Sequence, residues 1–377
     1  MILIENGPGG TAAHFDAPRG LIRADRAGEV APALAALDRA QQDGLWAAGF
    51  LSYEAGYALE PRLKPLMPEA RRLPLLAFGL YDRPVPGVDL LVRAEAEAPG
   101  ARLGSVTPDW DRAAHGAALL SVLDYIRAGD IYQANLTMRM RARRDGSALG
   151  LYGALRTRQP VGHGAFVALP GLPALVSRSP ELFYQVDAAG RIETRPMKGT
   201  APRASNPAHD AALRLGLAAS VKDRAENLMI VDLLRNDISR VAEVGSVKVP
   251  ELFAIESYAT VHQMVSQVTG QLKPGTLPSA LLRALFPCGS ITGAPKIRAM
   301  EIIRELEATP RGAYCGAIGW IGPDGAQRFN VAIRTLTLYD GDEVEFGVGG
   351  GIVADSTPEG EYEEALWKAR FADLRPG

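Results

Sequence analysis

Two segments of this sequence each place two acidic residues three positions apart. Asp223 and Glu226 form one pair, and Glu361 and Glu364 form the other. On a helix, residues three apart share a face, so each pair would present its carboxylates side by side. Such oxygens suit Mg²⁺, which keeps several waters and binds through one or two carboxylates together with an anionic substrate. The spacing therefore indicates a magnesium site if the two faces meet across a cleft; two solvated helix faces are the alternative.

A lysine and a histidine are the candidate reactive side chains. Lys198 comes at the end of a short apparent strand. A lysine held beside a cation or in an apolar pocket loses its proton near neutral pH and becomes a nucleophile, whereas a lone lysine is usually a surface charge. His262 is either a polar contact in the same site or a histidine whose partners are purely structural.

Two glycine-rich segments offer backbone N–H groups to an anion. The run from Gly289 to Lys296 has a proline before its lysine and a shorter glycine spacing than the nucleotide phosphate loop, so it does not match that motif. The run 347–352 lacks the last glycine of the dinucleotide-binding pattern. Both runs still let an anion approach the main chain closely, and a structural turn is the alternative for each.

Hydrophobic periodicity indicates the elements that must position these residues. Apolar positions at helical spacing predict helices over 111–128, 221–239 and 295–307 and from Pro358 onward. Alternating or continuous apolar runs predict strands over residues 132–141, 164–169, 174–178, 182–186, 191–197, 314–321, 328–338 and 343–348. Strands joined by short turns indicate large, mostly antiparallel sheets flanked by helices, which is a mixed α and β (α+β) fold.

The chain is interpreted as one enzyme domain over residues 1–377 with two parts. Prolines and glycines gather in residues 83–111, and this predicts a long surface connection there. The connection would join a smaller N-terminal lobe, residues 1–100, to a catalytic core, residues 110–375.

The bulk composition excludes several classes of protein. Apolar residues make up 47% and charged residues 22% of the chain, which is typical of a soluble globular enzyme. The net charge of −2 gives no electrostatic case for a nucleic-acid or membrane partner. No apolar run approaches the ~20 residues that span a bilayer, and the first residues, 1–6, are not expected to form a secretory signal. Cys288 and Cys315 are far apart in the sequence, so buried thiols in a reducing cytoplasm are expected.

Eight short segments between residues 110 and 375 carry a resemblance to a known family. They are residues 130–136, 179–183, 196–200, 225–237, 289–296, 332–335, 349–351 and 361–364. Together, in this order and at this spacing, they closely resemble the chorismate-utilising enzymes, the family of anthranilate, aminodeoxychorismate, isochorismate and salicylate synthases. The resemblance implies the chorismate-binding fold of that family.

Two positions discriminate within the family. Anthranilate synthases typically carry alanine where this chain has Lys198, and aminodeoxychorismate synthases typically carry lysine. Isochorismate and salicylate synthases place a water-activating lysine where this chain has Gln133, whereas the members that use ammonia have glutamine. Both positions resemble the aminodeoxychorismate branch, which aminates chorismate for the synthesis of p-aminobenzoate and folate.

The resemblance also implies the roles of individual residues. Lys198 would be the catalytic nucleophile and Glu181 the general acid. Glu226 and Glu364 would bind Mg²⁺ directly, and Asp223 and Glu361 would reach it through water or orient its ligands. The substrate-binding residues would be Arg334, Tyr314, Gly199, Ser290, Gly349, Gly350, Gly351, Gln133 and His262.

The implied reaction is a covalent substitution on the chorismate ring. Lys198 would attack C2 and expel the C4 hydroxyl, with Glu181 supplying the proton, and ammonia would then add at C4 and release the lysine. No G-x-C-x-G nucleophile turn of a glutamine amidotransferase occurs in the chain, so a separate glutaminase subunit would supply the ammonia. The alternatives are an anthranilate synthase large subunit and a non-catalytic chorismate-binding partner of a glutaminase.

Overall fold

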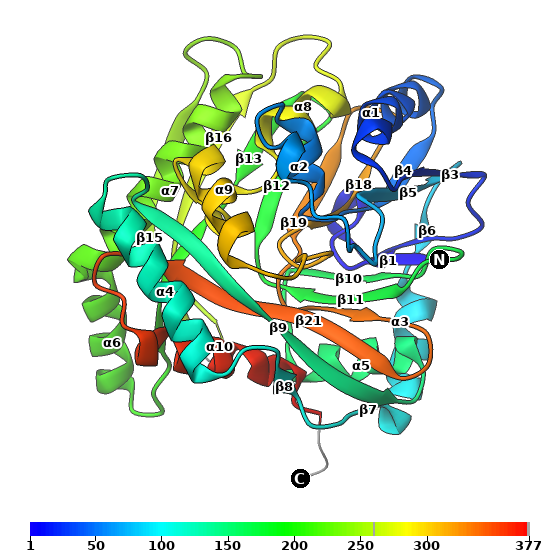
Figure 1. The fold of residues 1–377 in the computed structure, drawn as a ribbon. Helices are drawn as coiled ribbons and strands as arrows, with labels where there is room; N and C mark the ends of the chain where they lie inside the picture. The colour runs from blue at the N-terminus through cyan, green and yellow to red at the C-terminus, as the bar shows by residue number, and fades with distance from the viewer. Residues whose placement is uncertain (259–260, 375–377) are drawn as a thin grey trace.

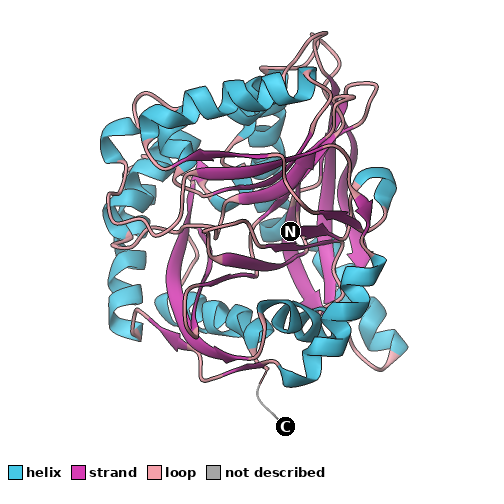
Figure 2. Cartoon of the chain, turned by 90° about the vertical axis from the view of Figure 1, so that its right-hand side faces the viewer, coloured by secondary structure: helices cyan, strands magenta, loops and turns pink. Residues whose placement is uncertain are grey.

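Alternation along the first strand shows how the molecule is layered. In a computed structural model, which describes residues 1–258 and 261–374, Leu3 packs in one apolar cluster while Ile2 and Ile4 pack in another. The cluster around Ile2 also contains Phe50 and Trp320, which belong to a second sheet. Because successive side chains of a strand point to opposite faces, Ile2 and Ile4 lie between two sheets, and Leu3 faces helices. The result is two stacked sheets with helices outside them (Figures 1 and 2).

The first sheet has eleven strands among the described residues, and every pairing in it is antiparallel. Its main path runs through β17 (Gly293–Ala294), β9 (Gln133–Asp145), β21 (Glu343–Ile352), β20 (Thr335–Leu338), β11 (Ala174–Ser179), β10 (His163–Val167), β1 (Ile2–Ile4), β2 (Ala13–Phe15) and β6 (Val85–Pro86). Two short strands also pair with β9, namely β7 (Arg102–Leu103) and β8 (Thr107–Pro108). The long strands β9 and β21 lie side by side across the middle of the molecule (Figure 1).

The second sheet has ten described strands and is also antiparallel. Its main path runs through β14 (Met197–Pro202), β16 (Val261–Gln271), β13 (Arg191–Thr194), β12 (Leu182–Val186), β19 (Gln327–Val331), β18 (Ala317–Ile321), β4 (Trp46–Leu51), β5 (Leu76–Tyr81) and β3 (Gly20–Ala24). The strand β15 (Lys248–Ser257) pairs with β16. The expected fold of large antiparallel sheets with flanking helices is therefore confirmed.

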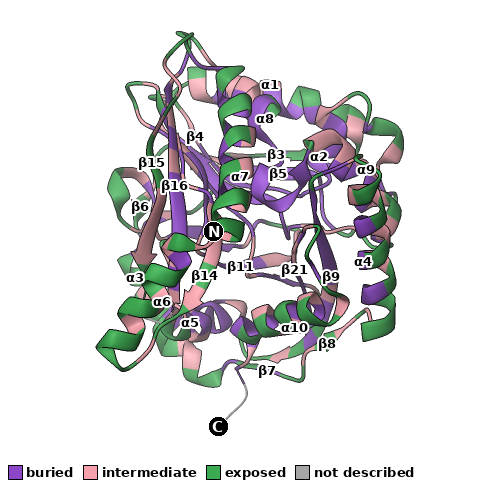
Figure 3. Cartoon of the chain, turned by 90° about the vertical axis from the view of Figure 1, so that its left-hand side faces the viewer, coloured by how far each residue is buried: buried purple, intermediate pink, exposed green. Residues whose placement is uncertain are grey.

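The helices bury one face against the sheets and expose the other (Figure 3). They are α1 (Ala27–Gln42), α2 (Ala55–Leu59), α3 (Val88–Glu97), α4 (Arg112–Arg127), α5 (Ala148–Arg158), α6 (Pro207–Ala219), α7 (Val221–Ser239), α8 (Pro278–Leu285), α9 (Lys296–Leu306) and α10 (Pro358–Ala369). Two of them carry the acidic pairs. The Ser220 hydroxyl caps α7 by accepting a hydrogen bond from the backbone N–H of Asp223. Helix α10 begins with Pro358, directly after its capping residue Thr357. No helix in the described part of the chain is long and apolar enough to cross a membrane.

Two passages of the chain between the sheets matter for the site. Glu181 lies between β11 of the first sheet and β12 of the second, and Arg334 lies between β19 of the second sheet and β20 of the first. The two passages are joined by hydrogen bonds, because Val331 N–H donates to the Glu181 carbonyl and the Ser179 hydroxyl donates to the Val331 carbonyl. The sheet junction therefore holds both passages in fixed positions.

Three expectations about local structure need correction. The strand expected over 328–338 is two strands in different sheets, because the backbone turns at Arg334, whose φ is 48°. The strand expected over 191–197 ends at Thr194, and Lys198 is the second residue of a new strand that begins after Pro196. The connection expected over 83–111 contains α3, whose Leu90 and Ala94 are buried in the core.

The boundary between an N-terminal lobe of residues 1–100 and a core of residues 110–375 stays a prediction. Strands from the first hundred residues take part in both sheets. β1 pairs with β10 in the first sheet, and β4 pairs with β18 in the second.

Candidate active site

The amine of Lys198 is an unpaired group on a half-buried side chain. The side chain lies on β14, which packs against α7, and it makes no hydrogen bond or ion pair with any residue in the described part of the chain. Burial lowers the pKa of Lys198, and the nearby carboxylates of Glu181, Glu226 and Glu364 oppose this shift without reversing it. The neutral amine is therefore favoured more than for an exposed lysine, and a neutral amine is the nucleophilic form.

Lys198 converges with Gln133 on the glycine run of β21. A methyl group at Gly351 would lie 2.0 Å from Nε2 of Gln133 and 3.4 Å from Nζ of Lys198. Both side chains therefore use the space that the missing side chain of Gly351 leaves. Oε1 of Gln133 is buried and has no hydrogen-bond partner among the described residues. A buried acceptor without a donor is costly, so this oxygen is available to a donor that a ligand brings.

Glu181 is a buried carboxyl group with one hydroxyl partner. The Ser290 hydroxyl donates to its Oε1 at 2.7 Å, and both side chains are buried. Burial raises the pKa of Glu181, while the hydrogen bond from Ser290 and the charge of Lys198 act in the opposite direction. A carboxyl group with a raised pKa retains its proton closer to neutral pH, as a general acid must.

The two acidic helix faces meet beside β21. Burial raises the pKa of Glu226 on α7, and the charge of Glu361 on α10 is among the causes that raise it further. Glu361 accepts a hydrogen bond from the Ser356 hydroxyl at 2.6 Å. A methyl group at Gly350 would lie 3.0 Å from Glu361 Oε2 and 3.7 Å from Glu364 Oε1. The acids of α10 therefore lie directly over the glycine run.

The oxygen donors at this place fit Mg²⁺, which needs one or two carboxylates and completes its shell with water and substrate. They do not form a closed protein cage: among the described residues, no three His, Cys, Asp or Glu side chains gather closely enough to hold a metal ion. Asp223 lies against the backbone, because a methyl group at Gly199 would come within 2.9 Å of its Oδ1. Gly199 has a φ of 88°, which glycine adopts without strain.

Arg334 is a second unpaired cation at the sheet junction. Burial lowers the pKa of its guanidinium, and no carboxylate or carbonyl group of the described residues pairs with its side chain. A largely buried guanidinium without a partner is unfavourable unless an anion binds it. Tyr314 lies on the loop that leads from α9 to β18, with its ring against Gly347 of β21.

His262 is held by protein partners in this structure. Its Nδ1 lies 2.8 Å from the Ser257 hydroxyl, and its Nε2 lies 3.1 Å from Oδ1 of Asp210. Both ring nitrogens therefore have protein partners in this structure, and a contact of His262 with a substrate stays a prediction.

Comparison with known proteins identifies the family. A family model described as chorismate binding enzyme matches residues 9–373. The chain belongs to this family. The curated protein "Aminodeoxychorismate synthase component 1" of Escherichia coli (strain K12) is 43% identical over 342 residues, which are 85% of this chain and 75% of that protein. "Aminodeoxychorismate synthase" of Streptomyces griseus is 46% identical over 72% of this chain, but the match covers only 38% of that longer protein.

A solved structure of the chorismate-binding family has the same fold. Anthranilate synthase component I from Streptococcus pneumoniae TIGR4 superposes with a TM-score of 0.80 at 25% sequence identity, covering 98% of this chain and 91% of that one.

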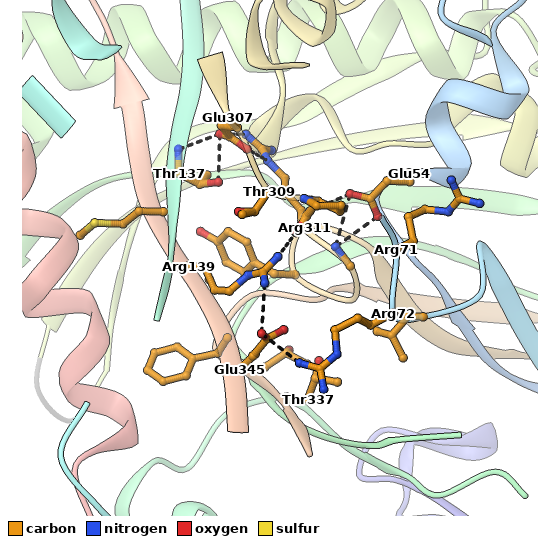
Figure 4. Close-up of a pocket in the computed structure, with 18 of the residues that line it drawn as sticks. Glu54, Arg71, Arg72, Thr137, Arg139, Glu307, Thr309, Arg311, Thr337 and Glu345 are labelled. Atoms are coloured by element: carbon orange, nitrogen blue, oxygen red, sulfur yellow. Dashed lines mark hydrogen bonds and ion pairs between the residues drawn. The ribbon is translucent and has the colours of Figure 1, made fainter. Parts of the chain in front are cut away.

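A buried charge network behind the candidate site was missed by sequence reasoning. The guanidinium of Arg311 pairs with Glu307 (Figure 4). It also donates to the carbonyls of Ile291 and Asn135. Glu307 in turn accepts from the backbone N–H and the hydroxyl of Thr137 on β9. This network fixes the loop that carries Tyr314.

The pocket in Figure 4 adjoins the site, and Lys198 is not among the residues that line it. Its lining includes Tyr314 and also Gly347, which precedes the glycine run on β21. Its carboxylates already have partners, since Glu345 pairs with both Arg72 and Arg139. We therefore assign the chemistry to the unpaired groups near Gly351 and not to this cavity.

Proposed function

We propose that this chain aminates chorismate to 4-amino-4-deoxychorismate through a covalent adduct on Lys198. The observation that carries the proposal is the unpaired amine of Lys198 beside Gln133 and Gly351, in a member of the chorismate-binding family. The curated relatives with the name aminodeoxychorismate synthase support this branch of the family.

The substrate would be held by its two carboxylates. Arg334 would bind the enolpyruvyl carboxylate, because a planar guanidinium can donate two parallel hydrogen bonds to it. Tyr314 would cover the substrate on the side of Arg334. The N–H groups of Gly349, Gly350 and Gly351 would line the opposite side of the substrate. Mg²⁺, held by Glu226 and Glu364, would neutralise the ring carboxylate and so favour both binding and the charged transition state.

In the first step, the Lys198 nitrogen forms a bond to C2 of the ring. The two ring double bonds shift, and the bond between C4 and its hydroxyl oxygen breaks. Hydroxide is a poor leaving group, so the proton of Glu181 joins it and water departs. The raised pKa of Glu181 and the lowered pKa of Lys198 both favour the protonation states that this step requires.

In the second step, ammonia forms a bond to C4, the double bonds shift back, and the bond between C2 and Lys198 breaks. Ammonia loses one proton as it becomes an amino group, and Glu181 recovers the proton that it gave up. The unpaired Oε1 of Gln133 is an acceptor in the right region to orient the N–H bonds of ammonia.

The ammonia would come from a separate glutaminase subunit. The relative from Escherichia coli is named component 1, which supports a two-component enzyme. The cytoplasm is the proposed compartment, supported by Cys288 and Cys315, which are both buried free thiols.

Mass spectrometry of the intact protein tests the covalent step. The protein is mixed with chorismate and Mg²⁺ without ammonia, and an adduct of chorismate less water is expected on Lys198. Lys198→Ala is the matched control and should carry no adduct and turn over at least about 10³-fold more slowly. Unchanged turnover by Lys198→Ala would remove the covalent step.

The product test separates the two amination reactions of the family. Chorismate, Mg²⁺ and ammonium should yield a product that releases p-aminobenzoate only after a separate lyase is added. Fluorescent anthranilate together with free pyruvate would instead identify an anthranilate synthase.

A further inference from the structure

We propose that the protein's own Lys368 takes the place of the divalent cation in the metal-free enzyme and must leave before the metal binds. The inference rests on the proposed function in one respect only, the assignment of Glu364 as a metal ligand. It concerns metal binding alone, so it can be tested without turnover.

The ammonium group of Lys368 bridges two oxygens that a hard metal ion would use. Its Nζ lies 2.7 Å from Glu364 Oε1 and donates to the carbonyl oxygen of Gly349 at 2.8 Å. Carboxylates and backbone carbonyls are both oxygen donors of the kind that bind hard divalent cations. A lysine four residues after a glutamate commonly pairs with it on a helix surface. The additional bond to Gly349 is different, because it ties α10 to the glycine run of β21.

The same small space holds the acids and the ammonium. A methyl group at Gly350 would lie 3.0 Å from Glu361 Oε2, 3.6 Å from Nζ of Lys368 and 3.7 Å from Glu364 Oε1. The absent side chain at position 350 therefore leaves a space into which an ammonium group and two carboxylates project. A divalent cation that enters this space meets the positive charge of Lys368 at close range, and the two repel each other.

This arrangement accounts for two features of the acidic groups on α7 and α10. Without a cation, carboxylates from α7 and α10 would repel one another, and Lys368 neutralises part of that charge. Lys368 also holds Glu364 by a direct ion pair, and among the described residues no three acids are gathered to hold a metal. When Lys368 moves away, Glu364 is released to bind the ion.

Lys222 on α7 provides a matched control. Its charge also acts on Glu226, Glu361 and Glu364, but its side chain is exposed and makes no direct bond to any of them. Lys222→Met and Lys368→Met therefore remove the same charge from the same acidic surface. Only Lys368→Met also frees the oxygens of Glu364 and Gly349.

Calorimetric titration with Mg²⁺ and with Mn²⁺, without chorismate, is the decisive measurement. We expect Lys368→Met to bind each ion about fivefold more tightly than the unmodified protein, as for the loss of a competing, partly exposed ion pair. Lys222→Met should change the affinity less than about twofold, because its charge is screened. Equal gains in both variants would show an effect of net charge only and overturn the proposal, as would unchanged or weaker binding by Lys368→Met.

Thermal unfolding provides a second readout. Without metal, Lys368→Met should melt at a lower temperature than the unmodified protein. Saturating Mg²⁺ should raise the melting temperature of Lys368→Met by more than it raises that of the unmodified protein. If Lys368→Met does not fold, Lys368→Gln is the variant to test in its place, because a glutamine amide can still donate to the carbonyl of Gly349. An equal rise in the melting temperature of all variants would overturn the proposal. A Lys198 adduct that fails to form while these shifts appear would reject the function and leave this inference intact.

Discussion

The hydroxyl of Ser290 lies 2.7 Å from Oε1 of Glu181, and both side chains are buried where the chain passes between the two sheets. Burial is the largest influence on Glu181 and raises its pKa, whereas the hydrogen bond from Ser290 lowers it. Ser290 therefore limits how far the pKa of Glu181 rises. The pH range in which Glu181 is an acid therefore depends on this hydroxyl group as well as on burial and on the charge of Lys198.

Replacing Ser290 should move the pH profile of the reaction. Ser290→Ala removes the bond that favours the ionised form, so the pKa of Glu181 rises further. Because the proposed step needs protonated Glu181, the alkaline limb of kcat/KM should shift upward by up to about one pH unit. The measurement is kcat/KM between pH 6 and 10. Glu181→Gln, which has no proton to lose, should lack this limb, and an alkaline limb that moves downward in Ser290→Ala would contradict the assignment.

Replacing Arg334 should separate activity from stability. Its guanidinium is largely buried without a partner, so the folded protein gains nothing from its charge until an anion binds. Arg334→Met should reduce kcat/KM at least about 100-fold, as for truncating one member of a buried charge pair. Its melting temperature should stay the same or rise.

Arg178 is the matched control for Arg334, because it is a fully buried arginine that has partners. It pairs with Glu5 and donates to the carbonyl of Gln159. Arg178→Met should therefore lower the free energy of unfolding by about 3 kcal/mol. A loss of stability of the same size in Arg334→Met would show that Arg334 is structural.

Much of the fold could be predicted from the sequence because it depends on local signals. The helix predicted over 221–239 has the observed bounds, since a capping serine precedes it and its buried positions recur at helical spacing. The turn at Arg334 carried no such signal. Apolar residues continue on both sides of it, with only a shift in phase between Ile333 and Leu336, and a positive φ is normally marked by glycine.

The missed parts of the site depend on contacts between distant segments. Lys368 resembles an ordinary surface lysine four residues after a glutamate, and only its bond to Gly349 distinguishes it. The bond from Arg311 to the carbonyl of Asn135 likewise joins the loop after α9 to β9 across more than a hundred residues of sequence. Helix α3 was missed because prolines on both sides of it suggested a loop.

Adding a methyl group to the glycine run should impair the chemistry directly. Gly351 has no positive φ, so alanine fits the backbone there, but its methyl group would lie 2.0 Å from Nε2 of Gln133. Gln133 must then move, and Lys198 loses space beside it. Gly351→Ala should slow formation of the Lys198 adduct by about 10- to 100-fold, because small misplacements of reacting groups are costly. Single-turnover mass spectrometry measures this rate.

The double variant Gly351→Ala/Gln133→Ser removes the side chain that would clash. If the effect is steric, it should form the adduct faster than Gly351→Ala alone. Adduct formation at the normal rate in Gly351→Ala would show that Lys198 does not act from this position.

The stability of the protein should fall in mild acid through His163. Burial lowers the pKa of His163 to about 3, and the nearby charge of Arg328 acts in the same direction. A histidine whose folded-state pKa is depressed favours folding above its unfolded-state pKa of about 6.5, and this contribution is lost as the pH falls toward 3. Urea unfolding measures the free energy of unfolding at pH 7 and at pH 4. The decrease in this free energy from pH 7 to pH 4 should be about 1–3 kcal/mol smaller in His163→Gln than in the unmodified protein. The same change at the exposed His209 should leave the pH dependence unaltered, and an equal effect of both variants would show that the acid sensitivity arises elsewhere.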